Sequence, residues 1–320
     1  AMRSSAVGED DRASFAGQYL TLLNVMPNNL CNAYKEILAG KYTAEAISYR
    51  IHYGLSDNDT PMAVLVMNMV DAVASGVLYT ADIGTNQEGR MSIHAIWGLG
   101  ELLVSGQTPA DMYTMSKDTP SRIIEKRISI KPYQMVRNRD GQTNTIAVAG
   151  DKTTQPSLDD AAAAKLARWG MELEKHFKQP QDIEWAVNTR GKLYLLQSRP
   201  LKSEFEQTDG PVCEFEDVRH DVLLDNGDRA ASGIAAGKVF NLENQPSLAA
   251  VPSGAILVAR NASPEYVKVI NRISAVVTDA GSSAGHFASV AREFNVPALV
   301  NTGNASRVLE HGRTVTVHAD

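Results

Sequence analysis

The chain has 320 residues, of which 43% are hydrophobic and 21% are charged, and its formal net charge is −6. This length and composition predict a soluble globular protein of about two domains. The acidic charge excludes a nucleic-acid partner bound through bulk charge, and no apolar run approaches the roughly 18 residues of a membrane span. Cys31 and Cys213 stand far apart and in no metal-type spacing, which indicates a reducing cytoplasm and argues against a disulfide framework or a zinc site.

The first residues, AMRSSAVGEDDRASFAG, contain no apolar signal core, so export is not expected. They are typical of the interior of a domain. Three origins fit this start: a cloned piece of a longer protein, a natural fragment, or a chain whose complementary piece lies elsewhere.

Hydrophobic periodicity defines the elements of the first part of the chain. It predicts helices over 33–54 and 158–177, the second with Ser157 as its N-cap. HAIWGLGELLVSG (94–106) predicts a strand that enters a glycine-broken loop. Val- and Leu-rich runs bounded by turn formers predict further short strands over 63–70, 76–81, 112–116, 123–130 and 132–137.

Residues 182–199, DIEWAVNTRGKLYLLQSR, predict a β-hairpin with a two-residue Arg190-Gly191 loop. This register sets Glu184 opposite Gln197 and Asp182 opposite Arg199. Because side chains alternate faces along a strand, one face carries Glu184, Gln197 and Arg199. The other face is expected to lie in the core, and it carries Ile183, Trp185, Val187, Tyr194 and Leu196.

The polar face of this hairpin has two interpretations. An acid beside an amide can bind a hard cation such as Mg²⁺ through oxygen, and the arginine can hold phosphate oxygens in a bidentate manner. The alternative is a solvated hairpin face with a surface ion pair. The N-terminal stretch is similarly open: Arg3, Gly17 and Thr21 can cradle phosphates, or they belong to a polar, disordered start.

The composition turns acidic over 203–218, SEFEQTDGPVCEFEDV, which predicts a linker. A compact α/β unit then alternates strands and helices to the end of the chain. Helices are expected over 263–271 and 286–294, and a helix or a turn near 304–310. Strands are expected over 237–241, 255–259, 274–278, 298–300 and 314–318.

His286 follows the loop TDAGSSAG and opens one of these helices. A helix N-terminus favours anions, so a phosphate on that imidazole would be stabilised there. The same dipole keeps the ring neutral and nucleophilic near pH 7. The alternative is a capping or surface histidine. The other six histidines have no such setting and are interpreted as structural or exposed.

These stretches, taken together, resemble a known family. RSSAVGEDDRASFAGQYLTLLNV, GVLYTAD, WGLGELLVSG and DIEWAVNTRGKLYLLQSRP occur in the order seen in the ATP-binding domain of phosphoenolpyruvate synthase and pyruvate phosphate dikinase. VTDAGSSAGHFASVAREFNVPALVNTG resembles that family's swivelling phosphohistidine domain. The resemblance covers nearly the whole chain and implies an α+β and α/β protein of two domains.

The resemblance implies an ATP-grasp-like nucleotide-binding domain over 1–202, incomplete at its N-terminus, the linker 203–218, and a swivelling β/β/α phosphohistidine domain over 219–320. It makes Mg²⁺ and ATP the cofactors. It implies ATP contacts by Arg3, Gly17 and Thr21, Mg²⁺ or phosphate ligation by Glu184 and Gln197, a phosphate clamp at Arg199, and a phosphoryl acceptor at His286.

The sequence departs from the family pattern at two points. Met67 stands where the family usually has a glutamine beside the adenine, and Ala284-Gly285 stand where it usually has Thr-Ser ahead of the histidine. Ser282 or Ser283 is a candidate substitute for that hydroxyl. The family's upstream lysine-bearing subdomain and its phosphoenolpyruvate and pyruvate barrel are expected outside these residues, before Arg3 and after Asp320.

The function implied is a cytoplasmic phosphotransferase that uses Mg-ATP to phosphorylate its own His286 and passes the phosphoryl group to pyruvate on another domain or partner. No nucleic acid or membrane partner is expected, and a homo-oligomer is an open possibility. Two alternatives remain: the same donor chemistry with an antibiotic or polysaccharide acceptor, or a non-catalytic nucleotide-binding or regulatory fragment.

Overall fold

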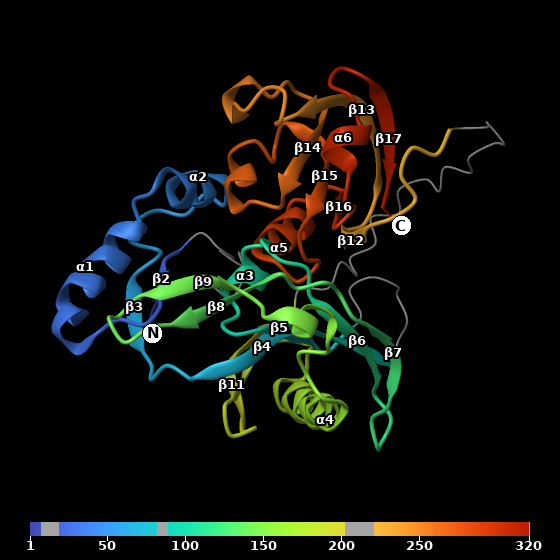
Figure 1. Ribbon diagram of the computed structural model, residues 1–320. Helices are drawn as coiled ribbons and strands as arrows, with labels where there is room; N and C mark the ends of the chain where they lie inside the picture. The colour runs from blue at the N-terminus through green and yellow to red at the C-terminus, as the bar shows by residue number, and fades with distance from the viewer. Residues whose placement is uncertain (8–18, 82–88, 202–220, 320) are drawn as a thin grey trace.

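The structure is a computed structural model that describes residues 1–7, 19–81, 89–201 and 221–319. It contains two units built on separate sheets, one stacked on the other (Figure 1), which confirms the expected two-domain mixture of helix and strand. Gly17 and the predicted linker 203–218 lie outside the described residues. Among the helices that the structure describes, none is both long and apolar enough to cross a membrane.

The first unit is centred on a six-stranded antiparallel sheet of order β11-β10-β4-β5-β6-β7. Helix α4 (Asp160–Phe177) covers one face of this sheet, and the other face lies toward the second unit (Figure 1). The strands are β4 (Ala72–Tyr79), β5 (Arg90–Trp97), β6 (Asp111–Ser116), β7 (Ile123–Arg127), β10 (Gln181–Asn188) and β11 (Leu193–Pro200).

The long helix was predicted correctly, but its predicted cap was wrong. Asp159 is the N-cap, and its carboxylate accepts a hydrogen bond from the backbone N–H of Ala162 at 2.7 Å. The Ser157 hydroxyl instead donates to the buried carboxylate of Asp111 at 2.7 Å. A tertiary partner on β6 therefore takes the side chain that the sequence assigned to the helix.

A second, three-stranded sheet of the first unit joins β2 (Thr21–Leu22), β1 (Met2–Ala6) and β3 (Met62–Val66). Two helices follow β2, so the single helix predicted over 33–54 was wrong. A short 3-10 turn η1 (Pro27–Asn29) precedes α1 (Leu30–Gly40), and the chain then turns before α2 (Ala44–His52). Thr43 caps α2 by accepting from the backbone N–H of Ala46, which fixes the break.

The predicted strand over 63–70 ends at Val66, and residues 67–70 are irregular. The loop after β5 contains the short helix α3 (Glu101–Val104). A hairpin of β8 (Tyr133–Arg137) and β9 (Thr143–Ala147), followed by the 3-10 helix η2 (Gly150–Thr154), supports this loop. The backbone N–H of Leu99 in the loop donates to the carbonyl of Met135 on β8 at 2.8 Å. Strand β9 was not predicted from the sequence.

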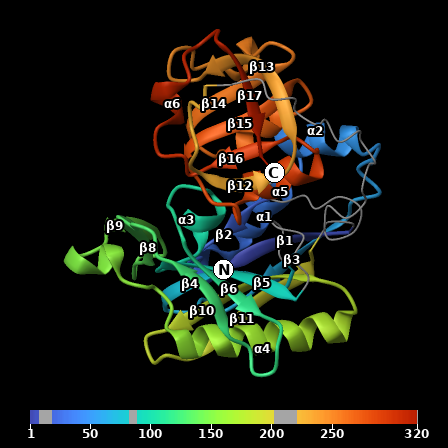
Figure 2. The same ribbon diagram turned by 90° about the vertical axis from the view of Figure 1, so that its right-hand side faces the viewer.

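The second unit is a six-stranded sheet of order β12-β16-β15-β14-β13-β17, in which β13 to β16 are parallel and the two edge strands antiparallel. Strand β12 was not predicted from the sequence. The α-helix predicted over 263–271 is instead the shorter 3-10 helix η4. Figure 2 shows α5 at the boundary with the first unit. The elements are β12 (Asp228–Ala231), β13 (Ile234–Asn241), η3 (Leu248–Ala250), β14 (Ala255–Asn261), η4 (Pro264–Lys268), β15 (Ile273–Ala280), α5 (His286–Glu293), β16 (Ala298–Val300), α6 (Ala305–Val308) and β17 (Thr314–His318).

Gly76 on β4 gives a test of this packing. An added Cβ would lie 1.8 Å from the carbonyl oxygen of His94 on the neighbouring strand and 2.8 Å from the Trp185 ring. Because backbone cannot yield easily in the middle of a sheet, Gly76→Ala should lower the free energy of unfolding by about 3 kcal/mol. Urea denaturation measures this loss.

Gly191 is the matched control, because it has a positive φ of 73° but no atom within 4 Å of an added Cβ. Gly191→Ala should cost only about 1 kcal/mol, from backbone strain alone. Equal losses in the two variants would contradict the packing assigned to Gly76.

Candidate functional site

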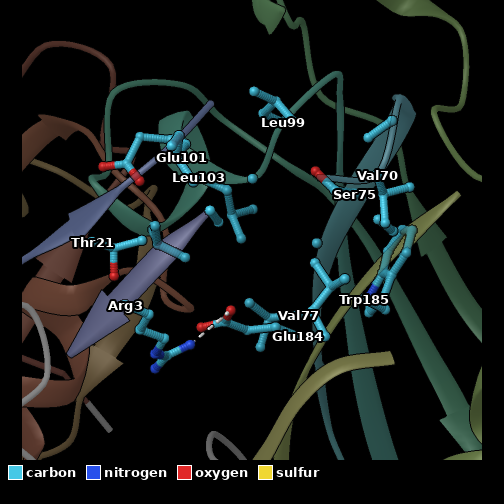
Figure 3. A pocket seen from close by; sticks show the side chains of 18 of the residues that line it. Arg3, Thr21, Val70, Ser75, Val77, Leu99, Glu101, Leu103, Glu184 and Trp185 are labelled. Atoms are coloured by element: carbon cyan, nitrogen blue, oxygen red, sulfur yellow. Dashed lines mark hydrogen bonds and ion pairs between the residues drawn. The ribbon is translucent and has the colours of Figure 1, made fainter. Parts of the chain in front are cut away.

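A cavity of about 350 Å³ lies between the two units, a size typical of small-molecule sites. Its walls come from β1, β2, residues 67–70, β4, the α3 loop and β10, all in the first unit. Pro264 and His286 line it from the second unit. In Figure 3, Arg3, Thr21 and Glu101 lie on one side of the cavity, and Val70, Ser75 and Trp185 lie on the opposite side.

Much of the cavity lining is apolar. This part suits a flat, weakly polar ring, since dispersion contacts and water exclusion favour such a group there. Its lining includes Leu20, Leu23, Met67, Met69, Val70, Val77, Leu99, Leu103 and Leu196.

The polar part of the cavity is built across two sheets. Arg3 and Thr21 are direct partners on β1 and β2, so their side chains share a face. The Arg3 guanidinium lies 3.5 Å from the Glu184 carboxylate on β10, and both side chains are partly exposed. This long, partly solvated ion pair leaves each group able to bind a further charged ligand.

The hairpin that carries Glu184 has the predicted register at the site but not at the turn. Glu184 lies opposite Gln197 and Asp182 opposite Arg199, as predicted. The loop, however, has three residues, because the backbone N–H of Asn188 donates to the carbonyl of Lys192. A bulge after Glu184 compensates by one residue, so two local errors cancel.

The bulge changes which residues of β11 enter the core. Leu193 is buried beside Trp185 in the core under α4, whereas the prediction placed Tyr194 and Leu196 there. Leu196 lines the cavity instead, although it was predicted for the opposite face. A bulge reverses the alternation of faces beyond it, so period-2 counting fails on that side.

Gln197 and Arg199 lie on β11 beside the cavity-lining Glu184. The Oε1 atom of Gln197 is buried and has no hydrogen-bond partner among the residues that the structure describes. Arg199 is paired with Asp182, with Nε at 2.8 Å and Nη2 at 2.7 Å from one carboxylate oxygen. Sequence reasoning omitted Asp182 from the site, although its own register already placed it opposite Arg199.

Glu101 is a second residue that sequence reasoning missed. It is the first residue of α3 and lines the cavity, where burial and the nearby charge of Glu184 raise the pKa of its carboxyl group. No hydrogen bond or ion pair to a described residue neutralises this carboxylate. The signal in the sequence was an acid within a glycine-rich loop, GLGE, between two apolar runs.

His286 begins α5 and lines the cavity from the second unit, with Gly285 as N-cap. Burial, together with the positive charges of Arg199 and Arg3, lowers the pKa of His286 to about 4. Its imidazole is therefore neutral at pH 7. The hydroxyl oxygen of Ser282 accepts from the N–H of Ala284 at 3.1 Å, within its own loop.

Two histidines with lowered pKa values, His94 and His286, make stability depend on pH. His94 on β5 also has its pKa lowered by burial to about 4, below the 6.5 of an unfolded histidine. The folded chain then binds fewer protons than the unfolded chain between pH 6.5 and 4, so this stability is complete above pH 6.5 and is lost as the pH falls toward 4. His94→Gln and His286→Gln should each reduce the pH dependence, measured by urea denaturation at pH 7 and pH 5. His176→Gln, an exposed site on α4, is the control that should leave the dependence unchanged.

Both units of the chain match models of known protein families. Residues 1–220 match the family model described as pyruvate phosphate dikinase, AMP/ATP-binding domain, and residues 251–320 match PEP-utilising enzyme, mobile domain. A solved structure of Enzyme I, determined by NMR in solution, is 25% identical over 23% of this chain and 30% of its own, with a TM-score of 0.22.

Curated relatives align along almost all of the chain. A probable phosphoenolpyruvate synthase of Pyrococcus horikoshii is 37% identical over 99% of this chain and 39% of its own length. A probable phosphoenolpyruvate synthase of Archaeoglobus fulgidus is 36% identical over 100% of this chain and 42% of its own length. The phosphoenolpyruvate synthase of Deinococcus radiodurans is 34% identical over 99% of this chain and 42% of its own length. The chain thus spans about two fifths of the length of these relatives. It belongs to the phosphoenolpyruvate synthase and pyruvate phosphate dikinase family, with an AMP/ATP-binding domain followed by a PEP-utilising mobile domain.

Proposed function

We propose that this chain carries out the nucleotide half-reaction of a phosphoenolpyruvate synthase, in which Mg-ATP phosphorylates His286. The observation that carries the proposal is the shared cavity. His286 reaches it from the mobile domain, while Arg3 and Glu184 reach it from the nucleotide-binding domain. A nucleophile, a cation and a carboxylate from separate units meet around one ligand-sized space.

The lining residues favour one orientation for the proposed nucleotide. The adenine ring would lie against the apolar wall near Met67 and Met69, and the phosphates would lie toward Arg3 and His286. The Arg3 guanidinium can bind phosphate oxygens in a bidentate manner. Arg199 adds positive charge from the next strand, held in place by Asp182.

The oxygen donors present fit Mg²⁺. Glu184 supplies a carboxylate at the cavity, and Gln197 supplies a buried carbonyl oxygen that lacks a partner among the described residues. The described residues contain no group of three or more His, Cys, Asp or Glu side chains placed to hold a metal alone. This suits a cation held jointly by one or two protein oxygens and substrate phosphates, as Mg²⁺ usually is. When bound, it would neutralise charge that develops on the phosphates.

The transfer needs a neutral imidazole facing a phosphorus atom. His286 supplies a free nitrogen lone pair at pH 7, because burial and the two arginines keep its pKa low. Its ring nitrogen forms the N–P bond while the P–O bond to the departing nucleotide breaks. Arg3 and Arg199 offset the negative charge of the phosphates and of the phosphohistidine product.

The phosphoryl acceptor is proposed from the relatives. The matched curated proteins are named phosphoenolpyruvate synthases, so we propose pyruvate as acceptor, bound by a part of the longer protein or by a partner. The mobile domain is the unit that would carry the phosphohistidine there.

Labelling tests the half-reaction directly. Incubation with ATP labelled in the β or γ phosphate should give a protein label that is stable in alkali and labile in acid, as phosphohistidine is. His286→Ala should abolish the label. Glu184→Gln should slow labelling by about 100-fold, because the carboxylate charge proposed to hold the cation is lost.

The matched control is Glu125→Gln, an exposed acid on β7 outside the cavity. It should label at the wild-type rate. Absence of label on the wild-type chain, or equal label on His286→Ala, would refute the half-reaction. Calorimetric binding of Mg-ATP without labelling would replace it with a regulatory nucleotide-binding function.

Met67 gives a prediction for nucleotide affinity. It lines the cavity where the family usually has an amide side chain, and its backbone is already paired with Ala1 at 2.8 and 2.9 Å. Met67→Gln keeps this backbone pairing and adds a hydrogen-bonding group for the base. ATP should then bind about fivefold tighter by calorimetry, the gain expected from one neutral hydrogen bond. Unchanged or weaker binding would place the base elsewhere in the cavity.

A further inference from the structure

Helix α5 contacts the first unit at both of its ends, and its second end has no part in the reaction proposed above. His286 begins the helix at the cavity, and Glu293 ends it two turns later. At 1.5 Å per residue, the two side chains are anchored about 10 Å apart along the axis. Whatever holds Glu293 therefore also fixes the direction from which His286 enters the cavity.

Glu293 is held by Tyr49 of α2 and by Tyr53, the C-cap residue that follows this helix, and both belong to the first unit. The hydroxyl groups of Tyr49 and Tyr53 both donate to one carboxylate oxygen, Tyr53 at 2.5 Å. The tyrosines are four residues apart and so lie on one face of α2, with ring centroids separated by 4.9 Å. Tyr49 is 1% exposed and lies in the apolar core of the second unit. The contact is thus a charge-assisted pair of hydrogen bonds within a largely dry interface.

Helix α2 is itself firmly anchored. The Arg50 guanidinium pairs with Asp57 at 2.8 Å and donates to the carbonyl of Lys41 at 3.1 Å. The Lys41 ammonium pairs with the same carboxylate at 2.9 Å. Both cationic side chains are almost fully buried, so α2 is a rigid support for its tyrosines.

The residue before Glu293 connects the two ends of α5. Arg292 donates to the carbonyl of Ser283, in the loop that precedes His286, at 3.0 Å. It also donates to the carbonyl of Ala230 at 2.8 Å, and its guanidinium carbon lies 5.8 Å from the centre of the Tyr79 ring on β4. The last turn of α5 is therefore tied both to the histidine loop and to the sheet of the first unit.

We propose that Tyr49, Tyr53 and Glu293 form a latch that holds the mobile domain on the nucleotide-binding domain, and that they are positioning residues for His286. Its use in phosphoryl transfer rests on the proposed function. A polar latch suits a contact that must open repeatedly, because phenol and carboxylate groups recover hydrogen bonds to water when the domains separate. A purely apolar contact would instead expose hydrocarbon to water each time the domains separate, which is unfavourable.

Chemical modification of His286 in the full chain tests the latch without ATP. Diethylpyrocarbonate reacts with neutral, accessible imidazole, and peptide mass spectrometry reads the modification of His286 specifically. Glu293→Gln and the double variant Tyr49→Phe, Tyr53→Phe should each expose His286 and raise its modification rate about tenfold, the population shift expected when a charge-assisted hydrogen bond is lost. Glu310→Gln, an exposed acid of the same unit, should react at the wild-type rate.

A second readout separates positioning from folding. The latch variants should bind Mg-ATP with the wild-type dissociation constant and retain the wild-type circular dichroism spectrum, while labelling of His286 slows about tenfold. The milder Tyr53→Phe variant should likewise raise the modification rate of His286 and lower its labelling rate. Wild-type modification rates in all latch variants would overturn the latch. Faster modification in variants of a chain that takes no label from ATP would leave the latch standing and refute the proposed function instead.

Discussion

The seating of α5 on the first unit is the interaction on which the candidate site depends. Without it, the cavity has no nucleophile, and the imidazole of His286 loses the burial and the two arginine charges that keep it neutral. Arg292 of α5 lies over the ring of Tyr79, and both Tyr79 and His94 are buried on neighbouring strands of the large sheet. The chemistry of the site thus depends on the stability of the interface, because His286 belongs to the second unit and the other polar cavity residues belong to the first.

The interface between the units includes several polar contacts. It contains the ion pair of Arg127 and Asp228 at 2.7 Å, the Arg292 guanidinium over the Tyr79 ring, and a carboxylate held by two phenols. Each of these groups can be rehydrated at modest cost, which favours a reversible association of two units that fold on their own sheets. Apolar contact between the units occurs where Tyr49 joins the core of the second unit and where Ala284 packs with Leu102 and Leu103.

The hairpin shows how a site can be predicted correctly from an incorrect local structure. Counting from a two-residue turn placed Glu184 opposite Gln197, and the structure has that pair. The true loop is one residue longer, and a bulge removes the extra residue before the site. Turn length and bulges depend on backbone hydrogen bonds, such as those that the Asn188 side chain accepts from Arg190 and Lys192, which alternation of residue types does not report.

The sequence by itself predicted two units, most strands of both sheets, and the pairing of Glu184 with Gln197 on the hairpin, because apolar periodicity and residue type are local properties. It also located His286 at a helix start. Only the tertiary structure decided that Glu101 lines the cavity, that residues 33–54 form two helices, and that Tyr49 and Tyr53 meet Glu293. These features depend on contacts between segments far apart in the chain, as between Tyr49 and Glu293, where burial and charge arise only after the two units are stacked.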